Sequence, residues 1–146
     1  MNARAVAKYV QGSPQKARLV IDTIRGKKVP EALAILHFTK KRAAATIEKA
    51  LRSAVANASY VADERNISVD VDELWISSVH VDLGPTKLRR RRRPAPMGRA
   101  YSERRWRSHV TIEVSTEKPR AVAERDAQKA LKASNKKKAP SGQGME

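Results

Sequence analysis

The most constraining feature of this sequence is a long, strongly basic insertion between two stretches that alternate like β-strands. Trp75, Val79, Val81 and Leu83 alternate with polar or smaller neighbours, and so do Trp106, Val110, Ile112 and Val114. This period of two predicts two half-buried antiparallel strands. Between them, residues 84–105 carry nine Lys and Arg against one acid, Glu103. Hairpin loops usually have about two to five residues, so a connection of this length predicts a functional arm.

The composition of this arm indicates nucleic acid as its partner. Guanidinium groups pair bidentately with phosphate and stack on bases, and the arm contains the uninterrupted run Arg89–Arg93. A solvated charge run is the alternative, but Pro94, Pro96, Met97 and Gly98 make the far end stiffer and partly apolar. Because the arm has no apolar core of its own, we expect it to be ordered only when it is inserted into nucleic acid.

Length and composition limit the classes of protein that this chain can represent. Its 146 residues allow one domain and a tail, and the net charge of +16 attracts polyanions. No apolar stretch approaches the roughly 18 residues of a membrane span, and no signal peptide opens the chain. We therefore expect a soluble intracellular protein that does not bind membranes. The absence of cysteine excludes disulfides and thiolate metal sites.

The charge is unevenly distributed along the chain. Residues 1–59 hold 12 bases and 3 acids, residues 60–83 hold 1 base and 6 acids, and residues 84–109 hold 10 bases and 1 acid. An acidic segment between two basic ones indicates that one surface faces away from the polyanion.

Three helices are predicted in the first half of the chain, after a short strand over residues 3–10 with Val6 and Val10 on one face. Ser13-Pro14 is a typical helix start, and Gly26 is a typical left-handed end. A second helix runs from Pro30 to about residue 37. Thr39 is expected to cap the third and longest helix, whose apolar stripe extends from Ala44 to Ala58.

Residues 60–73 are acidic and lack a helical period, so we expect a loop there. Asp70 and Asp72 could place two carboxylates on one side of an extended segment, as acid-base or metal chemistry requires, but a solvated loop is favoured because no partner group accompanies them. His37, His80 and His109 lack metal-ligand spacing, and no catalytic motif is present. We therefore predict no enzyme activity, no metal and no cofactor.

Together these patterns predict an α+β domain over residues 1–116. Three helices pack on a small antiparallel sheet formed by residues 3–10, about 72–84 and 105–115, and one long extended β-hairpin covers about 84–105. Residues 117–146 are rich in Lys, Ala, Ser, Gly and Pro. A helix over 119–132 would offer too few large apolar residues for docking, so we expect a disordered basic tail.

Several segments resemble the family of the bacterial-type large-subunit ribosomal protein number twenty-two. The resemblance lies in residues 3–10, in Ser13-Pro14-Gln15-Lys16-Ala17-Arg18, in Gly84-Pro85-Thr86, in Gly98-Arg99-Ala100 and in Ser108-His109-Val110-Thr111. It covers about residues 2–115. In this chain the segment between Thr86 and Gly98 is about two residues longer than the family pattern, and Arg89–Arg93 replaces a run that is normally interleaved with apolar residues.

The resemblance implies a structural, monomeric protein of the cytoplasmic ribosome, which binds 23S ribosomal RNA and neighbouring large-subunit proteins. The hairpin of this family reaches the wall of the peptide exit tunnel, where it meets the nascent polypeptide and influences macrolide action. The tunnel-lining residues would be Lys87, Leu88, Arg89, Met97, Gly98 and Arg99. The candidate RNA-binding residues are Arg4, Lys8, Lys16, Arg18, Arg25, Lys27, Lys28, Lys41, Arg42, Lys87, Arg89, Arg90, Arg91, Arg92, Arg93, Arg99, Arg104, Arg105, Arg107 and His109.

Two other functions are consistent with a basic chain of this length. A DNA-bending architectural protein would use β-arms in the minor groove, but it usually needs an apolar dimer face, which we cannot locate here. A nucleic-acid-processing enzyme would need catalytic residues, which the sequence lacks. We therefore favour a structural RNA-binding protein that assists assembly by neutralising phosphate charge.

Overall fold

The computed structural model describes residues 1–86, 90–119, 122 and 124. The elements are β1 (Asn2–Gln11), α1 (Pro14–Ile24), α2 (Val29–Phe38), α3 (Arg42–Glu64), the 3₁₀ turn η1 (Val71–Glu73), β2 (Trp75–Leu83), β3 (Arg90–Pro94), β4 (Ala100–Arg104) and β5 (Arg107–Ser115). Three helices and a small antiparallel sheet confirm the predicted α+β class. No helix among the described residues is long and apolar enough to cross a membrane.

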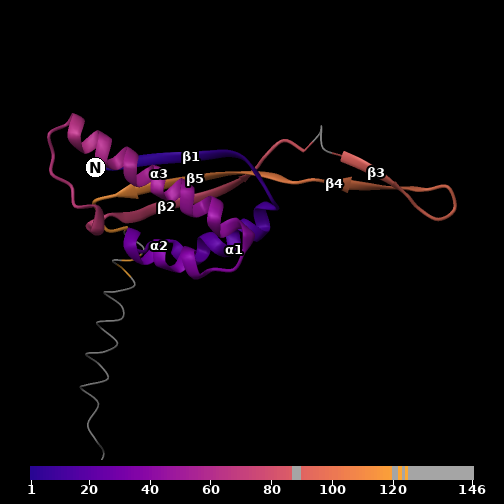
Figure 1. Cartoon of the computed structure of the whole chain (residues 1–146), viewed down its shortest axis with the longest axis horizontal. Coiled ribbons are helices and arrows are strands. Elements are labelled where there is room, and N and C mark those ends of the chain that lie inside the picture. The colour runs from indigo at the N-terminus through magenta and orange to yellow at the C-terminus, as the bar shows by residue number, and fades with distance from the viewer. Residues whose placement is uncertain (87–89, 120–121, 123, 125–146) are drawn as a thin grey trace, which may run out of the picture.

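The main sheet has three antiparallel strands in the order β1-β5-β2 (Figure 1). Ala5 on β1 and Val79 on β2 both lie opposite Ile112 on the central strand. Directly opposed residues point to the same side of a sheet, so these three side chains share one face. That face is buried against the helices, and it forms one hydrophobic core with them.

Each helix contributes an apolar stripe to this core. α3 packs against β1 and β5, α1 packs against β2, and α2 packs against the other two helices. Among the large fully buried side chains are Ile21 and Ile24 of α1, Leu36 of α2, and Ile47 and Leu51 of α3. Alanines at positions 44, 50, 54 and 58 of α3 are also buried, which lets this helix lie close to the sheet.

Two bulges change which residues face the core. The pairing of β1 with β5 is irregular between Ala7 and Val10, and the pairing of β2 with β5 is irregular between Ile76 and Ser78. An extra residue reverses the alternation of side chains on one side of the bulge. The core therefore receives Ile76 where simple alternation predicted Trp75, which is only half-buried.

The expected face of the first strand is also corrected. Ala3 and Ala5 are buried, whereas Val6 is 41% exposed on the opposite face. The sequence pattern was misleading because the larger apolar residue of the strand does not lie in the core. α3 packs against this part of the sheet, where β1 contributes the small side chains of Ala3 and Ala5.

The proline and glycine signals are confirmed in α1, but the Ser13 hydroxyl forms no capping hydrogen bond, and the cap predicted for α3 is wrong. Pro14 is the first residue of α1, and Gly26 follows its end with φ +72°. Thr39, expected to cap α3, instead lies at the end of α2, where its Oγ1 donates to the carbonyl of Ile35 at 2.7 Å. α3 begins at Arg42 and continues through residues 60–64, where the acidic composition had indicated a loop.

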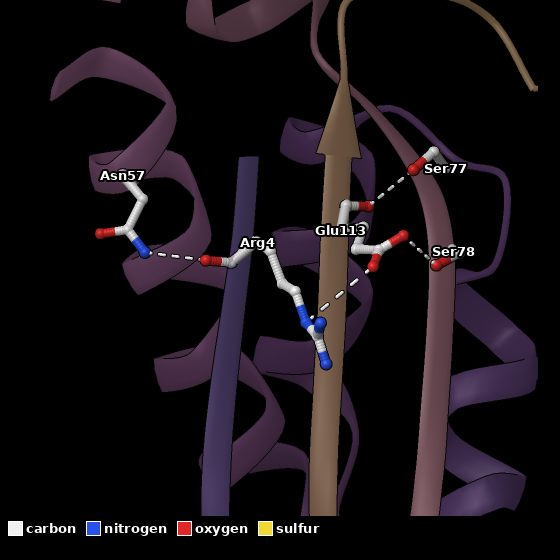
Figure 2. Close-up of polar contacts among 5 residues, drawn as sticks. All are labelled: Arg4, Asn57, Ser77, Ser78 and Glu113. Carbon is white, nitrogen blue, oxygen red and sulfur yellow. Dashed lines mark hydrogen bonds and ion pairs between the residues drawn. The ribbon is translucent and has the colours of Figure 1, made fainter. Parts of the chain in front are cut away.

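The sheet face opposite the helices carries a polar network (Figure 2). Glu113 of β5 accepts a hydrogen bond from Ser78 Oγ of β2 at 2.7 Å, and its other carboxylate oxygen lies 3.9 Å from Arg4 Nε of β1. Asn57 Nδ2 of α3 donates to the carbonyl of Arg4 at 2.9 Å. The two Glu113 contacts tie all three strands to one another across this face, whereas the Asn57 hydrogen bond joins α3 to the edge strand β1.

The chain after β5 stays close to the domain over the residues that the structure describes. The ammonium group of Lys118 lies 5.4 Å from the centre of the Trp75 ring. Gly26 also lies so close to Val122 that an added Cβ would come within 2.5 Å of Val122 Cγ2. The expected domain boundary at residue 116 stays a prediction, and most of the expected disordered tail lies outside the described residues.

Candidate nucleic-acid interface

The basic insertion forms a two-stranded antiparallel ribbon that projects well beyond the helices (Figure 1). β3 pairs with β4 from Arg90 opposite Arg104 to Pro94 opposite Ala100. A ribbon of this kind has no third strand or helix against it in the described part of the chain, so backbone hydrogen bonds and the turn define its shape. The extended hairpin predicted from the sequence is therefore present.

The pairing of the ribbon separates its side chains into two faces. Arg91 and Arg93 share one face with Tyr101 and Glu103, and Arg93 Nη2 lies 3.3 Å from Glu103 Oε1. Arg92 lies on the opposite face, opposite Ser102 and in line with Arg104. The only acid of the arm therefore neutralises part of one face, while the other face presents arginines without an acidic neighbour.

The turn at the far end of the ribbon is apolar and tightly bent. Met97 and Gly98 both have left-handed backbone angles, with φ +60° and +69°, and the amide of Ala95 donates to the carbonyl of Arg99 at 2.9 Å. The Met97 side chain is 94% exposed. The proposed tunnel-lining residues Met97, Gly98 and Arg99 thus lie at the extremity of the arm. Lys87, Leu88 and Arg89 lie outside the described residues.

Two arginines that were predicted to bind RNA hold the edge strand β2. Arg18 Nη2 of α1 donates to the carbonyl of Val81 at 3.0 Å, and Arg25 Nη2 donates to the carbonyl of Val79 at 3.4 Å. In the part of the chain that the structure describes, β2 has β5 as its one neighbouring strand, and the carbonyls of an edge strand need partners. Both arginines are nevertheless exposed to solvent. Their contact with RNA therefore stays a prediction, in addition to this structural role.

Three further predicted cations have partners within the domain. Lys27 forms an ion pair with Glu31 on α2, and Arg4 faces Glu113 in the network of Figure 2. Lys28 Nζ lies 5.5 Å from the centre of the Trp75 ring. These side chains already interact with partners inside the domain. Their attraction to a phosphate is therefore weaker than that of an unpaired cation.

His109 has a structural role at the bulge of β1. Its Nδ1 accepts a hydrogen bond from the amide of Tyr9 at 3.0 Å, and the two rings meet edge to face. Tyr9 has φ +58° at the bulge of β1, next to Lys8, and Arg107 Nη1 donates to its carbonyl at 3.1 Å. The two predicted RNA-binding residues of β5 therefore hold the bulge in place.

The remaining predicted cations gather where the arm leaves the domain. Lys16 on the first turn of α1, Lys41 and Arg42 at the start of α3, and Arg105 between β4 and β5 line one hollow. They come from three separate parts of the sequence. Reasoning from the sequence did not select the exposed aromatic residues Trp106, which lines this hollow, and Tyr101, which lies opposite Arg93 on the ribbon. Their only signal was an aromatic ring within an arginine-rich segment.

In the acidic segment, Asp70 contacts the backbone of its own turn. Asp70 Oδ1 accepts a hydrogen bond from the amide of Asp72 at 3.0 Å and so caps η1. Among the described residues, no group of three or more His, Cys, Asp or Glu is arranged to hold an ion. The segment that carries these acids follows α3 at the end of the domain away from the arm (Figure 1).

Comparison with known proteins identifies the family of this chain. Residues 5–115 match the family described as Ribosomal protein L22p/L17e. The chain is 50% identical over 115 residues to the large ribosomal subunit protein uL22 of Solibacter usitatus (strain Ellin6076), covering 79% of this chain and 96% of the relative. It is 52% identical over 118 residues to the uL22 protein of Halothermothrix orenii (strain H 168 / OCM 544 / DSM 9562), covering 81% and 98%. The chain belongs to the ribosomal protein L22p/L17e family.

Proposed function

We propose that this chain, as a structural protein of the large ribosomal subunit, binds 23S ribosomal RNA and aids assembly, and that its arm lines the peptide exit tunnel. It is not an enzyme, and it works in the cytoplasm within the ribosome, as its family membership indicates. The observation that carries the proposal is the projecting ribbon of arginines, in which no side chain of residues 91–94 or 100–104 is buried. A ribbon without an apolar interior is suited to threading between RNA segments.

The electrostatic part of this proposal can be tested on the isolated protein. Each phosphate neutralised contributes about 0.7 to 0.9 to the slope of log affinity against log salt concentration. We expect Arg91→Gln combined with Arg92→Gln to lower that slope by about 1.4 to 1.8 on a large-subunit RNA fragment. Lys49→Gln combined with Arg65→Gln removes the same charge from α3 and its end, and it should leave the slope nearly unchanged.

A filter-binding titration at several salt concentrations gives the slope for each variant. Equal slopes for the two double variants would contradict a role for the arm. Binding to duplex DNA of the same length provides a second comparison. Equal affinity for DNA and ribosomal RNA would favour the architectural DNA-binding alternative.

The tunnel-lining role rests on the exposed apolar turn at the end of the arm. A photo-reactive p-benzoylphenylalanine in place of Met97 should cross-link to a stalled nascent chain in assembled ribosomes. The same group in place of Tyr60, an exposed residue of α3, is the control and should not cross-link to it. Cross-links from position 97 to RNA or other proteins only would show that the turn does not reach the tunnel.

A further inference from the structure

A hollow of about 800 Å³ lies where the arm joins the domain. Four segments line it: the end of β1, the first turns of α1 and α3, and residues 105–108. Its volume is within the range of pockets that enclose small organic groups, roughly 300 to 1,000 Å³. No residue of the ribbon strands β3 and β4 lines it, so this pocket is a separate surface from the arm.

The charge of the pocket is entirely positive. Lys16, Lys41, Arg42, Arg105 and Arg107 line it, and its lining includes no acid. No described carboxylate forms an ion pair with any of these five side chains. Cations that converge from separate segments without a counterion favour an anionic ligand.

Two helices begin at this pocket and add to its positive potential. Ser13 and Lys41 precede α1 and α3, both line the hollow, and neither side chain forms a capping hydrogen bond. Neither helix has an acid in its first turn. The first amides of a helix carry a partial positive charge, and a phosphate group can accept hydrogen bonds from them.

The same pocket also has an apolar wall, which a phosphate alone does not require. Trp106 is 38% exposed and Leu19 is 58% exposed, and both line the hollow with Val10, Ala17 and Ala43. The Trp106 ring has Arg104 above it, with the guanidinium carbon 6.0 Å from the ring centre. An exposed indole next to cations is the combination that proteins use to stack an unpaired base while they hold its phosphate.

We propose that this pocket binds one unstacked nucleotide of an RNA loop or bulge. The base lies against Trp106 and Leu19, and its phosphate lies at Lys16, Lys41 and Arg42. This inference rests on the proposed RNA-binding function. It goes further because it places one unpaired nucleotide in the pocket where the arm joins the domain. An acidic peptide would satisfy the cations but would leave the indole without a stacking partner.

The test compares a bulged RNA hairpin with a fully paired hairpin of the same length, both titrated against the full chain. Stacking on an aromatic side chain strengthens binding by roughly fivefold to hundredfold per base. Trp106→Ala should weaken binding of the bulged RNA by such a factor and leave the paired RNA nearly unchanged. Trp106→Phe should restore most of the preference. Phe38→Ala, which removes another exposed aromatic ring, is the matched control.

Tryptophan fluorescence reports the contact directly. In a Trp75→Phe background Trp106 is the only indole, and the bulged RNA should quench it far more than the paired RNA or an oligo-glutamate peptide of equal charge. The pocket proposal would be overturned if the peptide quenched the fluorescence as much as the bulged RNA does. It would also be overturned if Trp106→Ala weakened the binding of both RNAs by the same factor. Failure of the wild-type chain to bind either RNA would instead overturn the proposed function.

Discussion

Replacing Ile112 by alanine should destabilise the domain strongly, because this residue lies at the centre of the sheet. Its side chain is fully buried and lies between Ala5 and Val79 on the neighbouring strands. The substitution removes three carbon atoms, or about 2.4 kcal/mol of transfer free energy, and leaves a cavity that raises the total to about 3 kcal/mol. For a domain of this size, the thermal midpoint should fall by roughly 10 °C.

Val6→Ala is the matched control, because it removes an apolar group from the opposite face of the same sheet. Val6 is 41% exposed and leaves no cavity, so we expect a loss of about 1 kcal/mol or less. Urea unfolding followed by circular dichroism gives the free energy of unfolding for both variants. Equal losses of unfolding free energy in Ile112→Ala and Val6→Ala would show that the buried and exposed faces of β1 and β5 are assigned incorrectly. The slope of unfolding free energy against urea concentration should be the same in both variants as in the unsubstituted protein.

Three further predictions concern contacts outside the centre of the sheet. Gly26→Ala should lower the free energy of unfolding by about 1 to 2 kcal/mol, because φ is +72° and the new Cβ meets Val122. Adding Val122→Ala should restore only the part of this loss that comes from the contact with Val122. Ser78→Ala and Glu113→Ala should be coupled by about 0.5 to 1 kcal/mol in a double-mutant cycle, and strict additivity would contradict their hydrogen bond. His109→Phe keeps an aromatic ring but removes the acceptor for the bulge amide, so it should cost about 1 kcal/mol and speed amide exchange at the bulge.

Much of the fold follows from signals that act over a few residues. Ser13-Pro14 and Gly26 mark the two ends of α1, and both act through the backbone angles of their own positions. The alternation in 107–115 likewise predicted a strand. Where two local signals competed, the prediction was wrong. Thr39 was a suitable helix cap by residue type, but its hydroxyl bonds to the preceding helix.

The sequence by itself determined that this chain carries an arginine-rich arm on a small α+β domain, because charge and periodicity are properties of consecutive residues. Only the tertiary structure decided which of those charges act together. The pairing of β3 with β4 places Arg93 beside Glu103 and Arg92 on the other face, and strand register depends on contacts between distant residues. The gathering of Lys16 and Arg42 around Trp106 likewise depends on packing that brings two helix starts and the base of the arm to one place.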